Sequence, residues 1–122
     1  MCIRDRLYHG LLSRIPGVIT QLTGSNVVNV YWMNSIAIDA SLYGKTSEQL
    51  VDHLKQKGID TRPLFVGMHR QPSLKKYGCD CAGKYPVTDF LSRNGFYLPS
   101  ASTLKEEEIE YICETINSFR SI

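Results

Sequence analysis

The chain has 122 residues, of which 43% are apolar and 21% are charged, and its formal net charge is +2. This is the composition of one ordinary globular domain, and the near-neutral charge argues against a nucleic-acid-binding surface. No apolar run approaches the roughly 20 residues that cross a bilayer, and charged residues interrupt positions 4–6, where a signal peptide needs an apolar segment. We therefore expect a cytoplasmic protein that binds neither nucleic acid nor membrane.

The four cysteines do not form a recognisable metal or disulfide framework. Cys79 and Cys81 are two residues apart, and the others, Cys2 and Cys113, are isolated. A zinc site needs about four ligands at recurrent spacing, and no second pair is present. We expect reduced thiols and no metal site.

The first half of the chain predicts a helix followed by a central strand. Residues 7–14 carry leucines on one helical face, and Ile15-Pro16-Gly17 ends that helix. Residues 1–6 have no structural signature, and residues 18–25 are predicted to be a polar, Thr-rich connection. Residues 26–38 alternate β-branched and aromatic residues, the pattern of a central strand.

Two aromatic residues of that strand receive different interpretations. Trp32 is predicted to lie in the core. Tyr31 is a candidate for contact with a ligand, with packing as the alternative.

The second half predicts two further helix–strand units and a last helix. A helix begins after Thr46, where Gln49 completes a capping box, and it ends at Gly58 in the left-handed conformation. A strand over 59–66 follows, at an edge or broken by Pro63.

Beyond Pro72 we expect a helical turn at 73–77, a helix over 85–93 and a short strand at 96–98. In the helix over 85–93, Pro86 occupies the first turn, and Val87, Phe90 and Leu91 face inward. The last helix, capped by Thr103 and Glu106, carries apolar residues at three- and four-residue intervals up to Phe119. This order predicts an α+β two-layer sandwich, with a small, mainly antiparallel sheet and helices on one face.

Thr61–Pro72 contains the side chains best suited to binding a ligand. Arg62 is a fixed planar cation suited to a carboxylate, and His69 changes charge near neutral pH. The prolines disfavour a regular helix or sheet here, so the stretch predicts a shaped loop on a rigid support, where binding groups are common.

Five segments carry a family resemblance, and it runs from about Leu7 to the end of the chain. They are NVYWMNSIAID at 29–39, GIDTRPLF at 58–65, MHRQP at 68–72, YPVTDFLSRNGFYLPS at 85–100 and TLKEEEIEYICETI at 103–116. In this order and spacing they resemble the C-terminal domain of the DegT/DnrJ/EryC1/StrS family of pyridoxal-phosphate sugar aminotransferases. The YWM, TRPLF and LPS segments are most similar to its perosamine synthase branch.

The resemblance implies a domain organisation and a reaction. Residues 18–122 would form the C-terminal small domain of a fold-type I aminotransferase, and residues 1–17 a leader and the end of a truncated linking helix. The intact protein would be a homodimer that uses pyridoxal 5'-phosphate. It would convert a nucleotide-linked 4-keto-6-deoxy sugar to a 4-amino sugar with glutamate as amino donor.

The resemblance also implies roles for the candidate residues. His69 would hydrogen-bond the nucleotide-sugar substrate, Arg62 would seat a carboxylate or phosphate or pair with a helix end, and Tyr31 is the third candidate for substrate contact. The Schiff-base lysine would lie in the large N-terminal domain, so we predict no catalytic or cofactor-binding residue here and no transamination by this chain alone. Asn34 and Val66-Gly67 depart from the expected pattern, so the resemblance does not define which sugar is the substrate.

The predicted fold by itself is also compatible with a second class of function. Small α+β sandwiches also serve as free-standing modules that bind small regulatory molecules.

Overall fold

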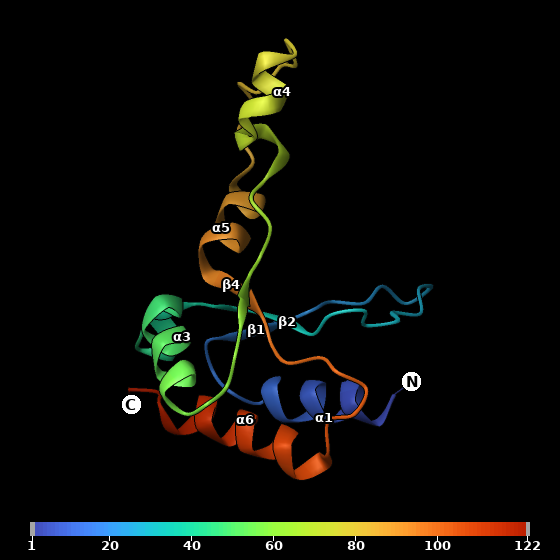
Figure 1. The fold of residues 1–122 in the computed structure, drawn as a ribbon, viewed down its shortest axis with the longest axis vertical. Coiled ribbons are helices and arrows are strands. Elements are labelled where there is room, and N and C mark those ends of the chain that lie inside the picture. Colours follow the sequence, from blue (N-terminus) through green and yellow to red (C-terminus); the bar gives the residue numbers. More distant parts are fainter. Residues whose placement is uncertain (1, 122) are drawn as a thin grey trace.

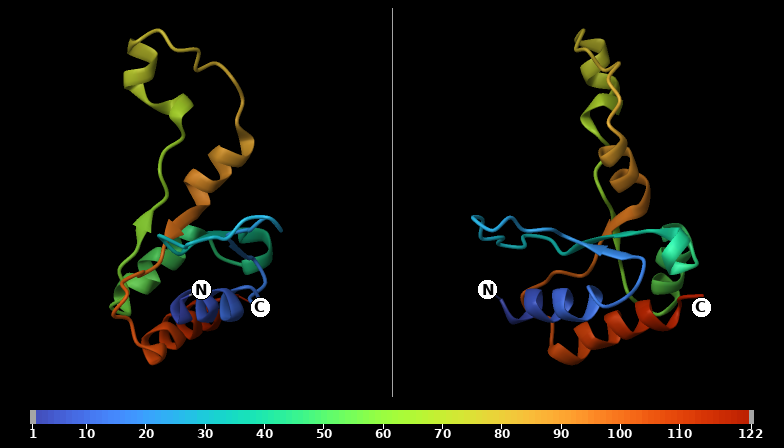
Figure 2. Two further views of the ribbon diagram at one scale, coloured as in Figure 1. Left: turned by 90° about the vertical axis from the view of Figure 1, so that its right-hand side faces the viewer. Right: turned by 180° about the vertical axis from the view of Figure 1, so that it is seen from behind.

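Residues 2–121, which the computed structural model describes, contain a four-stranded sheet in the order β1-β2-β4-β3, and every neighbouring pair is antiparallel. Its strands are β1 (Val18–Thr20), β2 (Ser35–Ile38), β3 (Arg62–Pro63) and β4 (Gly95–Tyr97). The helices are α1 (Ile3–Leu12), α2 (Ala40–Tyr43), α3 (Ser47–Gln56), η1 (Met68–Arg70), α4 (Pro72–Lys76), α5 (Pro86–Asn94) and α6 (Glu106–Ser118). Helices α1 and α6 lie side by side against one face of the sheet, and α3 closes one end (Figures 1 and 2). The predicted α+β class is confirmed.

The core lies between the sheet and these three helices. Helix α6 buries apolar residues at the predicted three- and four-residue spacing, and α3 contributes Leu50 and Leu54, both fully buried. The core members from α6 and the sheet are Ile109, Ile112, Cys113, Ile116, Val18, Ile36, Ile38 and Phe96. Because burial of apolar area is the main favourable term in folding, this layer holds the domain together.

The predicted capping of α3 is confirmed at both ends. The Thr46 hydroxyl accepts a hydrogen bond from the Gln49 N–H at 3.2 Å, and the Thr46 N–H donates to Gln49 Oε1 at 2.9 Å. Gly58 has φ +77°, the left-handed conformation predicted for the residue that stops the helix.

The prediction of one strand over residues 26–38 is wrong in its first part. Only Ser35–Ile38 is paired, and Trp32 is 74% exposed instead of lying in the core. The pairing partner is Val18–Thr20, which was predicted to be a connection. Pairing between β1 and β2 ends at Thr20, so the alternating residues before Ser35 have no ladder to join. They belong to a long loop, residues 21–34, that projects from the sheet (Figure 1); we call it the β1–β2 loop.

Residues 64–94 form a second projection, which we call the arm (Figures 1 and 2). One limb leaves β3, passes through η1 to α4 at the tip, and the other returns through α5 to β4. Strand β3 is shorter than the predicted 59–66 because Pro63 has no N–H to extend the ladder, although its edge position is as predicted. Helix α5 begins at Pro86 as predicted, but the inward orientation of its apolar face is wrong: Val87, Phe90 and Leu91 are exposed.

One local prediction about a helix end is also corrected. Helix α6 begins two residues later than a Thr103 cap requires: the carboxylate of Glu108 accepts from the Lys105 N–H at 2.8 Å. The short helix α2 follows Asp39, and its Tyr43 is fully buried and donates to the Ile116 carbonyl. Within residues 2–121, none of the helices has the length and apolar character of a membrane span.

Candidate functional site

A hollow of about 440 Å³ opens where three chain segments meet at one end of the sheet. Its lining residues come from the end of the β1–β2 loop, from residues 60–62 at the start of β3, and from the end of β4 with the segment that follows it. They are Trp32, Met33, Asp60, Thr61, Arg62, Tyr97, Leu98, Pro99, Ser100 and Ala101. The antiparallel order brings β2, β4 and β3 side by side, so the segments that enter and leave these strands converge here.

The hollow offers one cation, two aromatic faces and several polar groups. Arg62 is exposed on edge strand β3, and its guanidinium makes no ion pair with any residue from 2 to 121. The alternative role of Arg62 as an ion-pair partner for a helix end therefore has no support within the described chain. An unpaired guanidinium with Trp32 and Tyr97 nearby can bind a phosphate or carboxylate and stack against a planar group.

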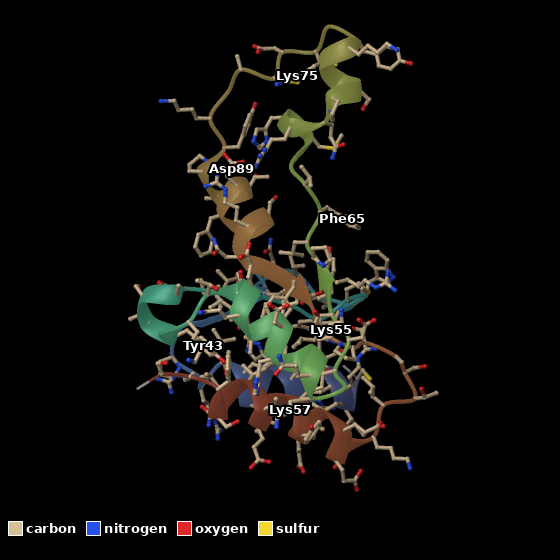
Figure 3. All side chains as sticks on the ribbon, turned by 60° about the vertical axis from the view of Figure 1, so that its left-hand side comes forward. Tyr43, Lys55, Lys57, Phe65, Lys75 and Asp89 are labelled. Atoms are coloured by element: carbon tan, nitrogen blue, oxygen red, sulfur yellow. The ribbon has the colours of Figure 1, made fainter. Side chains whose placement is uncertain are left out.

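His69 lies on the outgoing limb of the arm and contacts the returning limb. Its Nε2 is 2.9 Å from Asp89 Oδ1 of α5, and its ring packs on Tyr85 with a centroid distance of 4.7 Å. Figure 3 shows Asp89 on the returning limb, across the arm from Phe65 on the outgoing limb. Because a carboxylate accepts only, neutral His69 donates at Nε2 and keeps Nδ1 as an acceptor.

Gly67 makes this position of His69 possible. A Cβ at Gly67 would lie 2.6 Å from His69 Cε1 and 2.7 Å from Thr88 Cγ2, closer than real contacts of this kind. The departure at Val66-Gly67 noted in the sequence therefore has a physical reason: the imidazole occupies the space that a side chain would need.

Tyr31 has an unusual backbone conformation. Its φ is +43°, in the region that non-glycine residues rarely adopt, and the residue is 8% exposed. Its N–H donates to Asn29 Oδ1 at 2.8 Å, and its carbonyl accepts from Arg4 Nη2 at 3.0 Å. Such a conformation costs of order 1–3 kcal/mol and persists only where surrounding contacts enforce it.

The three residues singled out from the sequence thus lie in three places. Arg62 lines the hollow beside Trp32; Tyr31 lines a different hollow of about 670 Å³ between α1 and the β1–β2 loop; His69 sits within the arm. Sequence reasoning missed Trp32, Tyr97 and Ser100 as lining groups. The YWM and LPS segments that contain Trp32 and Ser100 were the available signal, but the alternating pattern assigned the indole to the core.

The shifted pKa values belong mainly to core groups. Burial raises the pKa of Tyr43 to about 12, with Arg120 opposing, and burial raises the pKa of Cys113 to about 12. Burial also raises the pKa of Tyr8, whose hydroxyl donates to the Pro99 carbonyl at 2.8 Å. These groups stay protonated at neutral pH, and the Tyr8 hydrogen bond joins α1 to Pro99, which lines the hollow. Within residues 2–121, no three His, Cys, Asp or Glu side chains come together as metal ligands.

Comparison with known proteins identifies relatives across almost the whole chain. The model of the DegT/DnrJ/EryC1/StrS aminotransferase family matches residues 4–117. A GDP-perosamine synthase of Escherichia coli O157:H7 is 38% identical over 97 residues, covering 79% of this chain and 24% of the relative. A GDP-perosamine synthase of Vibrio cholerae is 24% identical over 113 residues, covering 93% of this chain and 30% of the relative.

Solved structures show the same fold. An aminotransferase of Brucella abortus superposes with a TM-score of 0.77 at 23% identity, covering 98% of this chain and 31% of that one. DesV of S. venezuelae superposes with a TM-score of 0.78 at 19% identity, covering 95% of this chain and 30% of that one. The chain thus spans about a quarter to a third of the length of these relatives.

Proposed function

Because the chain belongs to the DegT/DnrJ/EryC1/StrS aminotransferase family, we propose that it is the C-terminal small domain of a nucleotide-sugar aminotransferase. Members of this family are pyridoxal-phosphate-dependent aminotransferases. The whole protein converts a nucleotide-linked 4-keto-6-deoxy sugar to the 4-amino sugar, with glutamate as donor. The observation that carries this proposal is the similarity to GDP-perosamine synthases along most of the chain. The free-standing regulatory module has no comparable support.

The chain's own lysines do not fit the cofactor. A Schiff-base lysine needs an enclosed position, with an acidic partner and a phosphate cradle around the bound ring. Lys45 has its Nζ 4.8 Å from the centre of the Phe119 ring. The remaining lysines are exposed, on α3, the arm and the start of α6, and Figure 3 shows Lys57 and Lys75 at opposite ends of the molecule. They are Lys55, Lys57, Lys75, Lys76, Lys84 and Lys105.

In this proposal the rest of the protein therefore binds the cofactor, and the present chain contributes residues that contact the substrate. Incubation of the chain with pyridoxal phosphate and borohydride should give no specific lysine adduct by mass spectrometry. A single lysine modified in stoichiometric yield would contradict this assignment.

We propose that the hollow beside Arg62 receives the nucleotide sugar. The guanidinium suits a diphosphate, and Trp32 and Tyr97 offer faces for a base or a sugar ring. His69 and Tyr31 stay as further candidates for substrate contact. His69 would use the acceptor nitrogen that Asp89 leaves free, so a substrate hydroxyl is the natural partner.

The uncovered apolar surface supports a larger assembly. The β1–β2 loop exposes Leu22, Val28 and Val30, and the arm exposes Phe65 and Met68. Large apolar side chains exposed together on a small domain indicate a contact with other protein. We propose that the large domain and a second copy in a homodimer cover these two projections.

Kinetics of the whole protein test the hollow. Arg62→Gln should raise the KM for the nucleotide sugar roughly tenfold or more, since a charge-assisted hydrogen bond contributes about 1.5–3 kcal/mol. Arg93→Gln, at an exposed arginine of α5, is the matched control and should change KM less than twofold. Equal effects of the two substitutions would reject the hollow as the binding site. His69→Ala should lower turnover, and an unchanged rate would remove His69 from the site.

A cytoplasmic location is part of this proposal. Cys2 and Cys79 are exposed, Cys81 is partly exposed, and all are free thiols. Free surface thiols suit a reducing compartment.

A further inference from the structure

The β2–β4 ladder ends beside the hollow with a pair that is only half regular. The register pairs Ser35 with Tyr97, so the next pair outward is Asn34 with Leu98. The Leu98 N–H donates to the Asn34 carbonyl at 2.8 Å, as in a hydrogen-bonded antiparallel pair. Such a pair ordinarily makes a second bond in return, which here would run from the Asn34 N–H to the Leu98 carbonyl.

The Ser100 hydroxyl takes the place of that second bond. The Asn34 N–H donates to Ser100 Oγ at 2.9 Å, and the Ser100 O–H donates in turn to the Leu98 carbonyl at 2.9 Å. Two hydrogen bonds and an oxygen atom therefore span a gap that a single bond of about 2.9 Å closes in a regular ladder. We call this inserted hydroxyl the Ser100 wedge.

The Ser100 wedge lies on the side of the pair that faces the hollow. Within each residue the N–H precedes the carbonyl, so the direct bond lies toward the sheet and the relayed bond lies toward Met33 and Pro99. The two chains therefore diverge outward from the last direct bond. Continued register would place Trp32 opposite Ser100, and all four of these residues line the hollow. The wedge separates the wall that contains Trp32 from the wall formed by residues 98–101.

The wall formed by residues 98–101 is anchored independently of the wedge. The Tyr8 hydroxyl donates to the Pro99 carbonyl at 2.8 Å, and Tyr8 is 1% exposed in the core. Leu98 is buried as well, whereas Trp32 is exposed. If the gap closes, the Trp32 wall is therefore the one that moves. These residues all lie within the range 4–117 that the family model matches.

We propose that Ser100 is a positioning residue that sets the width of the nucleotide-sugar hollow. A serine hydroxyl has one donor, and the Leu98 carbonyl accepts it, so Ser100 acts through the Trp32 wall and donates no bond to substrate. Without the hydroxyl, the Asn34 N–H and the Leu98 carbonyl can pair directly, which draws Trp32 toward residue 100 and narrows the hollow. This inference rests on the proposed function of the hollow.

The first test is NMR spectroscopy of the Ser100→Ala variant. A scalar coupling across the new hydrogen bond should appear between the Asn34 amide nitrogen and the Leu98 carbonyl carbon. Trp32 is the only tryptophan of the chain, so its indole N–H gives one signal that needs no assignment. This signal should shift in Ser100→Ala as the Trp32 wall moves.

Two further variants provide the controls. Ser100→Thr keeps the hydroxyl and should leave the indole signal and the Asn34 amide close to those of the parent. Ser92→Ala removes a different hydroxyl that donates to a backbone carbonyl, that of Phe65 on the arm at 2.9 Å, and should leave the indole signal unchanged. An unshifted indole in Ser100→Ala, or equal shifts in the alanine and threonine variants, would overturn the inference.

Kinetics of the whole protein separate this inference from the proposed function. Ser100→Ala should raise the KM for the nucleotide sugar roughly fivefold or more, because a displaced wall weakens the contacts that orient the ligand. Turnover at saturation should change little, and Ser100→Thr should keep the parent KM. A shifted indole with an unchanged KM would reject the hollow as the substrate site and leave the Ser100 wedge standing. An unshifted indole would reject the wedge, whatever the KM shows.

Discussion

Two apolar residues of similar sequence pattern, Leu54 and Val87, lie in opposite environments. Both occupy apolar stripes of amphipathic helices, and Val87 was predicted to face inward. Leu54 is 0% exposed in the core, whereas Val87 is 70% exposed on the arm. Substituting each by alanine therefore measures how much of the apolar pattern stabilises the isolated chain.

Leu54→Ala should lower the free energy of unfolding by about 3 kcal/mol, because it removes buried methyl groups and leaves a cavity. In a domain of this size that corresponds to a fall in melting temperature of about 12 °C. Val87→Ala should change the free energy of unfolding by less than about 0.5 kcal/mol, because an exposed side chain makes few packing contacts and alanine favours the helix.

Urea unfolding followed by circular dichroism at 222 nm is the suitable assay, because α1, α3 and α6 supply most of the helical signal. Tryptophan fluorescence is less suitable, since Trp32 is already exposed in the folded chain. A loss of more than about 1 kcal/mol for Val87→Ala, independent of protein concentration, would show that the arm packs within one chain and refute the reasoning. A loss that grows with concentration would instead locate Val87 in a contact between copies.

Three further predictions follow from local structure. Thr46→Ala should lower the free energy of unfolding by about 1 kcal/mol, because it removes the α3 cap. Thr103→Ala should leave the free energy of unfolding unchanged in the same urea assay, because Thr103 does not cap α6 in the structure. Hydrogen bonds donated by the Ser41 hydroxyl and N–H lower the pKa of Asp39, so its stabilisation is present above the ordinary carboxyl pKa of about 4 and is lost as pH falls through the lowered value. Asp39→Asn should accordingly flatten the loss of stability as the pH falls below about 4, measured by urea midpoints, and an unaltered pH profile would contradict that role. Burial raises the pKa of Cys113 to about 12, so iodoacetamide at neutral pH should label the other cysteines within minutes and Cys113 only after unfolding, as mass spectrometry would show.

Local signals in the sequence predicted the helices well. The Thr46–Gln49 capping box, Gly58 after α3 and the apolar spacing of α6 all act within one or two turns, so neighbours in the chain contain the whole signal. The family resemblance was equally accessible, because it depends on the order and spacing of segments. The α+β class followed from the order of elements alone.

The strands were harder to predict because a strand needs a partner. The alternating pattern before Ser35 is as regular as that of β2, yet of these two stretches only β2 is paired, by β1 and by β4. The sequence of α5 likewise does not show what its apolar face contacts. The helix is amphipathic, but Val87 and its apolar neighbours are exposed and do not pack on the core. An apolar pattern predicts that a surface will be buried. It does not predict whether the same chain or another part of the assembly buries that surface.

The amino-acid sequence by itself determined the family and the main helices, since each depends on residues near one another in the chain. Only the tertiary structure decided that Arg62 shares a hollow with Trp32, that His69 contacts Asp89 across the arm, and that Tyr8 donates to the Pro99 carbonyl. These contacts join residues 20 to 91 positions apart. The hydrogen bonds between them depend on where the antiparallel sheet places each loop, which no local pattern specifies.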